Sequence, residues 1–270
     1  MIKVSIVTPV NNSSATIERN IRSVIDQTYS EIEHIIVDNS SSDNSLEIIR
    51  RLYSEVGKES MLKIISENDR GISDAFNKGI RNSVGEIIGI LNSDDFYCFN
   101  EVVKTITDAF NSDTQLLFVH GNIFFEDEQF GSNIRKPLLC KINEAMPYNH
   151  PTMFFRKSLY DKYGLFDEGY RYAMDYELVY RFEKSVENFR EKGKYIDGNP
   201  LVQMAAGGAS WKYEIESVRE LKKIINKYGD WNFSAKKSVF ARFIRIYLKS
   251  FFTSIGLRKI VRFSRDRKWN

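Results

Sequence analysis

The sequence predicts an α/β protein with a mostly parallel, doubly wound central sheet. Strand-like and helix-like segments alternate four times before about residue 110, the pattern of consecutive βα units. The strand-like segments are short continuous apolar runs, as expected of strands buried on both faces of a parallel sheet. Each run ends at polar or acidic residues, and the carboxyl ends of parallel strands share the sheet edge where ligands bind.

The four units follow one another from the N-terminus. The expected strands are 3–9, 33–38, 62–66 and the apolar run that begins at Ile87. The expected helices are one through Ile25, one containing Leu46, Ile49, Leu52 and Tyr53, one through Ile80, and one over 100–110. From Leu116 the pattern becomes β-rich, and two further helices are expected, one opened by Asp175 and one over 212–228.

The apolar run from Ile87 stops abruptly at two adjacent carboxylates, Asp94 and Asp95. Hard divalent cations prefer such oxygen ligands and keep open positions for substrate phosphates. A strand-ending turn or the N-cap of the next helix would also use an Asp-Asp pair. Polar side chains recur, however, at all four strand ends: Asn11 and Asn12, Asp38, Asp69 and Arg70, Asp94 and Asp95. This recurrence favours a site for a metal ion and a diphosphate.

Three other nucleotide-binding classes are disfavoured. No Gly-x-Gly-x-x-Gly follows the first strand, which disfavours a dinucleotide-binding enzyme, and no Gly-Lys-Ser/Thr loop indicates a P-loop NTPase. A sugar nucleotidyltransferase is disfavoured because no glycine- and basic-rich loop follows the first strand. A carboxylate-rich edge without a glycine loop needs a cation to hold phosphate.

Four ordered motifs closely resemble the nucleotide-binding half of family 2 glycosyltransferases of the bacterial polysaccharide-biosynthesis type, which have the GT-A fold. They are 7–17, 36–43, 66–80 and 91–95, and a fifth likeness, Ala-Ala-Gly-Gly-Ala-Ser, ends at Ser210. The resemblance implies a Rossmann-like, mostly parallel sheet with a smaller β-rich acceptor-side region, here followed by a C-terminal helical extension. The expected parts are a nucleotide-sugar-binding half (1–115), an acceptor-side half with the catalytic base (116–212), and C-terminal helices with a basic tail (213–270).

The resemblance also implies roles for individual residues on the donor side. Asp94 matches the closing acid of the family's Asp-x-Asp motif, so Asp94 and Asp95 are expected to bind Mg²⁺ or Mn²⁺. Asn92 stands where many members have the first Asp, and Asn11 where many have a Tyr that stacks on the base, a contact worth roughly 1–3 kcal/mol. The expected substrate-binding residues are Thr8, Pro9, Asn12, Asp38, Asp69, Asp74, Asn77, Asn92, Asp94 and His150. For Asp74, a charge that complements the helix dipole is an equal alternative.

On the acceptor side, the resemblance makes Asp175 the general base. In an inverting transfer a carboxylate takes the proton of the attacking hydroxyl, and the leaving diphosphate needs none. Asp175 could instead only cap its helix, and Glu177 is an alternative base. His150 is expected to hydrogen-bond the acceptor or the donor sugar, or else to fix its loop.

The C-terminal segment is strongly basic. Residues 236–270 contain eleven Lys and Arg and one acid, Asp266, so their net charge is +10. Because the whole chain has a net charge of +3, residues 1–235 carry −7. An apolar stripe, with Arg242, Arg245 and Lys249 on its other side, is typical of an interfacial helix on an anionic membrane. The alternatives are a helix packed on the body or a dimer contact; the acidic body disfavours nucleic acid as a partner. The stripe is Phe240, Phe243, Ile244, Tyr247, Leu248, Phe251, Phe252 and Ile255.

Composition and termini suggest a location. Only two cysteines, Cys98 and Cys140, occur, without metal or disulfide spacing, which favours a reducing compartment. We find no signal-peptide pattern and no run of about 18 apolar residues. We therefore expect a cytoplasmic protein, peripheral on the inner face of the plasma membrane.

These features together predict a metal-dependent inverting glycosyltransferase of the hexosyltransferase type. Its expected partners are a nucleotide-diphosphate sugar donor and a lipid-linked or oligosaccharide acceptor, used in cell-surface polysaccharide biosynthesis. The alternative is a non-catalytic, membrane-associated scaffold that binds nucleotide sugars, for which the substitutions at Asn11 and Asn92 leave room.

Overall fold

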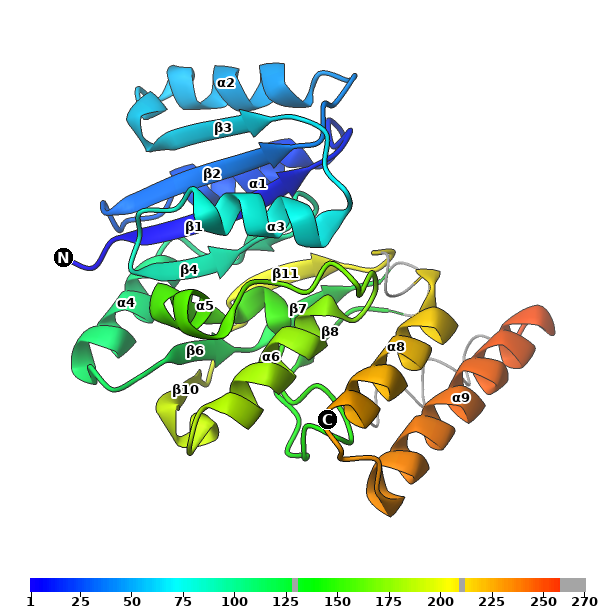
Figure 1. Ribbon diagram of the computed structural model, residues 1–270. Coiled ribbons are helices and arrows are strands. Elements are labelled where there is room, and N and C mark those ends of the chain that lie inside the picture. The colour runs from blue at the N-terminus through cyan, green and yellow to red at the C-terminus, as the bar shows by residue number, and fades with distance from the viewer. Residues whose placement is uncertain (128–130, 209–211, 258–270) are drawn as a thin grey trace.

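Two sheets form the framework of the chain (Figure 1). The structure is a computed structural model that describes residues 1–127, 131–208 and 212–257. The larger sheet has the order β10-β6-β9-β4-β1-β2-β3, and the smaller has the order β5-β11-β7-β8. The larger sheet consists of β1 (Val4–Val10), β2 (Ile32–Asp38), β3 (Leu62–Ser66), β4 (Ile87–Ile90), β6 (Phe118–Gly121), β9 (Phe154–Arg156) and β10 (Gly193–Ile196). The smaller consists of β5 (Phe96–Tyr97), β7 (Ile123–Glu126), β8 (Asn133–Arg135) and β11 (Val202–Ala205).

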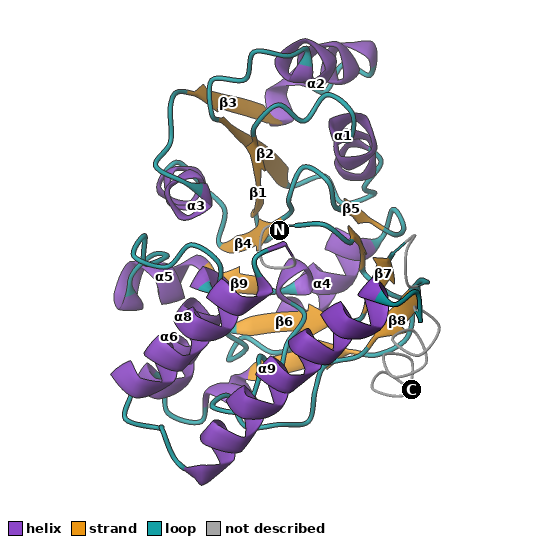
Figure 2. Cartoon of the chain, turned by 90° about the vertical axis from the view of Figure 1, so that its right-hand side faces the viewer, coloured by secondary structure: helices purple, strands orange, loops and turns teal. Residues whose placement is uncertain are grey.

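The first four strands confirm the predicted parallel arrangement. β1 pairs in parallel with β2 and with β4, and β2 pairs in parallel with β3. Neighbouring side chains on β2 point to opposite faces, so that Ile36 packs with α1 and α2 while Ile35 and Val37 pack with α3. Figure 2 shows α1 and α3 on the two sides of this sheet. The helices of these units are α1 (Ile17–Ile25), α2 (Ser45–Glu55), α3 (Ile72–Arg81) and α4 (Val102–Ser112), and a 3₁₀ turn, η1 (Glu59–Met61), precedes β3.

β9 is the antiparallel member of the large sheet. It lies between β4 and β6 and pairs antiparallel with both. Gly89 of β4 permits this close approach, because a Cβ atom there would lie 2.4 Å from the ring of Phe154. The strands of the first half, β1 to β4, and the later strands therefore share one sheet.

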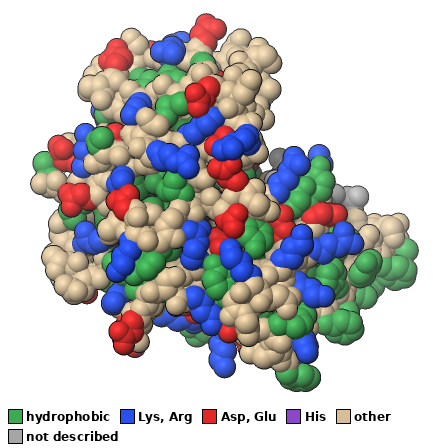
Figure 3. All heavy atoms as spheres, in the orientation of Figure 1, with side chains coloured by type: hydrophobic (Ala, Val, Ile, Leu, Met, Phe, Trp, Pro, Cys, Tyr) green, Lys and Arg blue, Asp and Glu red, His purple; other side chains and the backbone are tan. Residues whose placement is uncertain are grey.

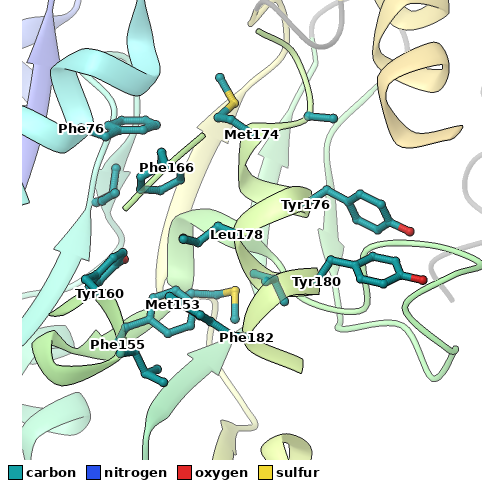
Figure 4. Packing of buried hydrophobic residues seen from close by; sticks show 14 of the residues in the cluster. Phe76, Met153, Phe155, Tyr160, Phe166, Met174, Tyr176, Leu178, Tyr180 and Phe182 are labelled. Carbon is teal, nitrogen blue, oxygen red and sulfur yellow. The ribbon is translucent and has the colours of Figure 1, made fainter. Parts of the chain in front are cut away.

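The largest core cluster surrounds α6 (Met174–Ser185). Figure 4 shows Phe155, Tyr160 and Phe182 grouped on one side of this helix, while Tyr176 and Tyr180 point to the other. On that second side, the Tyr180 ring stacks on Tyr228 with the ring centroids 4.9 Å apart. α6 thus joins the sheet to the C-terminal helices. The remaining helical segments are η2 (His150–Thr152), α5 (Lys157–Tyr163), η3 (Phe189–Lys192), α8 (Glu214–Lys227) and α9 (Phe233–Ser254).

A buried carboxylate fastens α6 to α8. Glu177 is fully buried and accepts hydrogen bonds from Arg181 at 2.9 Å, Lys227 at 2.9 Å and the hydroxyl of Tyr228 at 2.8 Å. Burying an ionised carboxylate costs several kcal/mol unless such partners compensate, so α6 and α8 are held as one unit. Within the described ranges, no helix has the length and apolarity needed to traverse a bilayer.

A buried hydrogen-bonded line crosses β1, β2 and α2. His34 Nε2 lies 2.8 Å from the hydroxyl of Thr8, and His34 Nδ1 lies 2.6 Å from that of Tyr53. All three side chains are buried. Burial lowers the pKa of His34 to about 3, so the imidazole is neutral in the folded protein.

The low pKa of His34 predicts a stability loss in mild acid. Below pH about 6.5 the unfolded chain protonates His34 while the folded chain does not, so unfolding becomes more favourable as the pH falls toward the folded pKa. Between pH 6.5 and 5 this contributes about 2 kcal/mol to the decrease in the free energy of unfolding. Urea unfolding at pH 7 and pH 5 should show a smaller decrease for His34→Gln than for the wild type.

His120 provides the matched comparison. Burial lowers its pKa to about 4, so it makes its own contribution, which His34→Gln retains and His120→Gln loses. The same pH dependence in His34→Gln and the wild type would contradict the assignment to His34.

Candidate active site

A cleft of about 940 Å³ opens at the carboxyl ends of the central strands. Its walls come from the end of β1 and the loop that follows, the β3–α3 loop, the turn after β4, the loop before α6, and the end of β11. Segments that are far apart in the sequence thus meet at one sheet edge, as parallel strands require. Of the residues expected at the site, Pro9, Asn12, Asp69, Asn92, Asp94 and Asp95 line the cleft.

The turn after β4 presents two different carboxylates. Asp94 is exposed in the cleft, whereas Asp95 is 2% exposed and accepts a hydrogen bond from Asn92 Nδ2 at 3.2 Å. The buried Asn20 fixes this turn, since its Nδ2 donates to the carbonyls of Asn92 at 2.8 Å and Asp95 at 2.9 Å. The surrounding cleft walls keep part of the water away from the Asp94 carboxylate, which raises its pKa although the residue is exposed. Burial, together with the negative charge of Asp94, raises the pKa of Asp95 well above its usual range.

These residues fit a divalent cation that is held together with a diphosphate. Besides the carboxylates, the buried Oδ1 of Asn92 has no hydrogen-bond partner among the described residues, so it is an available oxygen ligand. Throughout 1–127, 131–208 and 212–257, no three His, Cys, Asp or Glu side chains gather as a metal site. Mg²⁺ commonly takes only one or two protein carboxylates and completes its shell with phosphates and water, so a site of this kind would not need three such side chains.

Asn12 shapes the end of the cleft formed by the loops after β1 and β2. Its backbone has φ 50°, a left-handed conformation that Asn tolerates, and its Oδ1 accepts from Ser42 N at 2.9 Å. Its own backbone N–H donates to Ser41 Oγ at 2.9 Å. Asn12 thereby ties the loop after β1 to the loop after β2, while Asn11 beside it also lines the cleft.

Thr8 and Asp38 lie behind the cleft and are not among its lining residues. Thr8 is fully buried in contact with His34, as described above. Asp38 is fully buried and accepts from Ser66 Oγ at 2.6 Å and Ser41 N at 3.2 Å, which joins the ends of β2 and β3. In this structure both side chains support the cleft wall.

Asp74 and Asn77 share one face of α3, as their spacing predicted, but protein groups occupy both. Asp74 accepts from the backbone of Arg70 at 3.0 Å and forms ion pairs with the side chains of Arg70 and Lys78. Burial raises the pKa of Asp74, but these bonds and charges outweigh it and lower the pKa overall. Asn77 accepts from Phe166 N and donates to Phe166 O, both at 2.9 Å, so its amide fastens the later half of the chain to α3.

Asp175 lies in the first turn of α6, half-buried, and accepts from the adjacent Tyr176 N at 2.8 Å. It is not the N-cap of α6, which is Ala173. The role of a cap is taken by Glu220 of α8, whose carboxylate accepts from three successive amides at 2.8–2.9 Å. The donors are Arg171 N, Tyr172 N and Ala173 N.

His150 and Asp175 are brought together. Burial lowers the pKa of His150, and the charge of Asp175 partly opposes this effect, which places the two groups within electrostatic reach. The His150 ring packs against Phe76 and Phe166, with centroids 6.5 and 6.1 Å away. Neither His150 nor Asp175 lines the cleft itself, although the cleft-lining Arg171 precedes Asp175 by four positions. Glu177, the alternative base, is fully buried and occupied by its three donors.

Sequence reasoning missed several groups around the cleft. Glu168 and Arg171 line it, and Glu168 forms an ion pair with Arg70 at 2.9 Å between the β3–α3 loop and the loop before α6. Glu220 was also missed, since an acid on an amphipathic helix is ordinarily a solvated residue. No local pattern in the sequence marks its distant backbone partners.

Comparisons with known proteins agree with the geometry. The sequence profile of Glycosyl transferase family 2 matches residues 5–174. The chain is 30% identical over 186 residues to the chondroitin synthase of Escherichia coli, which covers 67% of this chain and 26% of that protein. It is 29% identical over 212 residues to the uncharacterized glycosyltransferase EpsJ of Bacillus subtilis, covering 72% and 60%. The chain thus spans less than two thirds of the length of these relatives.

Two solved structures share the fold. The mannosyltransferase PcManGT of Pyrobaculum calidifontis, in complex with GDP-Man and Mn²⁺, has a TM-score of 0.64 at 14% identity and covers 97% of this chain and 84% of its own. S. aureus TarS 1–349, in complex with UDP-GlcNAc, has a TM-score of 0.63 at 18% identity and covers 97% and 79%. The GT-A fold predicted from the motifs is confirmed, and the chain belongs to glycosyl transferase family 2.

Proposed function

We propose that this protein is an inverting glycosyltransferase of the hexosyltransferase type. It transfers a sugar from a metal-bound nucleotide-diphosphate sugar to a saccharide acceptor, lipid-linked or free, in cell-surface polysaccharide biosynthesis. The observation that carries the proposal is the exposed Asp94 beside the unpartnered oxygen of Asn92 in a large cleft at the carboxyl edge of the sheet. Two comparisons support this substrate class. One sequence relative is named a chondroitin synthase, and the structurally similar PcManGT and TarS were solved with GDP-Man and UDP-GlcNAc respectively.

Different groups of cleft residues would bind different parts of the donor. Pro9, Asn12 and Asp69 line the part of the cleft built by the loops after β1 and β3, where a nucleoside fits. Asp94, with Asn92 and Asp95 beside it, would hold Mg²⁺ or Mn²⁺ at the diphosphate. When bound, such a cation would neutralise charge that grows on the leaving nucleoside diphosphate. The cleft volume is at the upper end of the range usual for small-molecule sites, which suits a ligand with a base, two phosphates and two sugars.

Asp175 is the proposed general base. The acceptor hydroxyl attacks the anomeric carbon, the bond to the diphosphate oxygen breaks, and the hydroxyl proton passes to the Asp175 carboxylate. The departing diphosphate leaves as an anion and requires no acid. Glu220 holds the backbone before α6 by three hydrogen bonds, so it orients Asp175 without contacting substrate.

Asp94→Asn should abolish metal-dependent donor binding. Thermal shift with UDP and GDP, with and without Mn²⁺ or Mg²⁺, should show stabilisation of the wild type by about 3 kcal/mol at a hundredfold excess over the dissociation constant. We expect Asp94→Asn to behave in Mn²⁺ as the wild type does in EDTA. Asp161→Asn, an exposed acid on α5, is the control. Nucleotide binding and donor turnover that EDTA leaves unchanged would refute the metal site.

Asp175→Asn should reduce kcat by about 10²- to 10⁴-fold, the usual contribution of a general base, with little change in donor affinity. The measurement is release of nucleoside diphosphate across a panel of donors and saccharide acceptors. Donor binding without turnover in the wild type across that panel would instead support the non-catalytic scaffold.

Glu220→Ala should lower kcat by about tenfold and leave the affinity for nucleotide unchanged, because it loosens the backbone that positions the base. Glu220→Gln should recover part of the loss, since its amide oxygen still accepts hydrogen bonds. Glu216→Ala, one turn earlier on α8 and exposed, is the matched control. Equal effects at both positions would remove the positioning role.

A further inference from the structure

α9 presents a stripe of large apolar side chains to solvent. Spacings of three and four residues place these side chains on one face of the helix. In Figure 3 hydrophobic side chains gather along the edge of the molecule formed by α9, with Lys and Arg nearby. The outer stripe consists of Phe240, Ile244, Tyr247, Leu248, Phe251 and Ile255, each between 42% and 67% exposed.

The opposite face of α9 fixes the rotation of the helix. Ala235 and Val239 are buried, and Phe243 and Ile246 pack against the main core. The side chain of Lys249 forms an ion pair with Glu214 of α8 at 2.7 Å. Ser234 and Ser238 donate hydrogen bonds to the carboxylate and the carbonyl of Glu144 respectively. With its inner face engaged, α9 cannot turn the outer stripe inward.

Two members of the expected apolar stripe do not belong to the exposed face. Phe243 packs inward, and Phe252 is only half-exposed. Arg242 and Lys249 lie across the helix from the outer stripe, as expected: Lys249 faces α8, and burial lowers the pKa of Arg242. The second basic and aromatic segment predicted near the C-terminus lies outside the described residues.

The charged side chains of α9 itself are all positive. Lys236, Lys237 and Arg245 are exposed, and the sequence of α9 contains no acid. A second copy of the chain that packed on the outer stripe would bring these cations of the two helices close together. Like charges so placed repel, whereas an anionic surface attracts them.

We propose that the outer stripe of α9 is a docking surface for an anionic phospholipid bilayer. The helix lies in the plane of the interface, with its apolar and aromatic side chains among the acyl chains and its cations at the headgroups. At 22 residues α9 extends about 33 Å along the surface. Aromatic side chains such as Tyr247 favour this boundary because one end of the ring is polar.

Through contacts of its inner face, α9 is also connected to the candidate active site. Lys249 of α9 pairs with Glu214, and the neighbouring Tyr213 ring lies 5.0 Å from that of Tyr172. Tyr172 directly follows Arg171, which lines the cleft. Docking through α9 therefore brings the wall of the cleft close to the bilayer, where a lipid-linked acceptor would be presented. This last step rests on the proposed function.

Sedimentation of the full chain with vesicles tests the docking surface. The vesicles are phosphatidylcholine alone or mixed with phosphatidylglycerol, and we expect binding mainly to the mixture, weakening with salt. Tyr247→Ser with Phe251→Ser should weaken binding by at least about tenfold. Lys236→Gln, Lys237→Gln and Arg245→Gln together should weaken binding to the anionic vesicles by about a hundredfold, since each cation contributes about a factor of five.

Val56→Ser with Val84→Ser is the matched control, because both are exposed apolar residues outside α9, directly after α2 and shortly after α3, and this variant should bind vesicles as the wild type does. UDP binding with Mn²⁺, measured for every variant without vesicles, reports folding and the donor site separately from membrane docking. The proposal is overturned if the wild type ignores anionic vesicles or if the stripe variant binds them equally well. A wild-type dimer in light scattering that the stripe substitutions convert to monomer, with vesicle binding unchanged, would assign the stripe to a second copy.

Discussion

The position of α6 depends on carboxylates that link it to α8. Glu177 is buried in the core and forms ion pairs with Arg181 and with Lys227 of α8. Glu220 reaches in the reverse direction, from α8 to the backbone amides before α6. Glu220 thus occupies the backbone amides before α6, while Asp175 accepts a hydrogen bond from the amide of the adjacent Tyr176. Much of what orients the candidate base thus lies beyond residue 174, where the family profile ends.

The strands of the first half were predictable because their signal is local. Each is an apolar run ended by polar residues, and the predicted 62–66 coincides with β3, while 3–9 and 33–38 differ from β1 and β2 by one residue. The later strands follow another logic. β9 pairs antiparallel inside a parallel sheet, and β5 pairs with β11 about a hundred residues away. Such pairings depend on which edges remain free once the first units have packed, and nothing in a short window of sequence records that.

The site was predictable at its edge but not behind it. Asp94 and Asp69 were placed correctly in the cleft because a strand's end fixes where its next residues emerge. Thr8, Asp38 and Asn77 were also expected at the site, yet their polar atoms are taken by neighbours from other segments. A sequence shows that a polar group stands at a strand end or on a helix face, but not whether a distant partner occupies it. The contacts of α9 with the body, which decided its rotation, were hidden for the same reason.

The insertion of β9 between β4 and β6 limits how this protein could be recombined. Strands β1 to β4 rely on β9, from the later half of the chain, to cover the open edge of β4, and Gly89 leaves room there for the ring of Phe154. Asn77 adds a second link between the two halves through Phe166. An exchange of the later halves between relatives, cut near residue 115, would sever a continuous sheet and its core. For the proposed transferase, new acceptor preferences are therefore more accessible through changes in the loops around the cleft than through the exchange of half-chains.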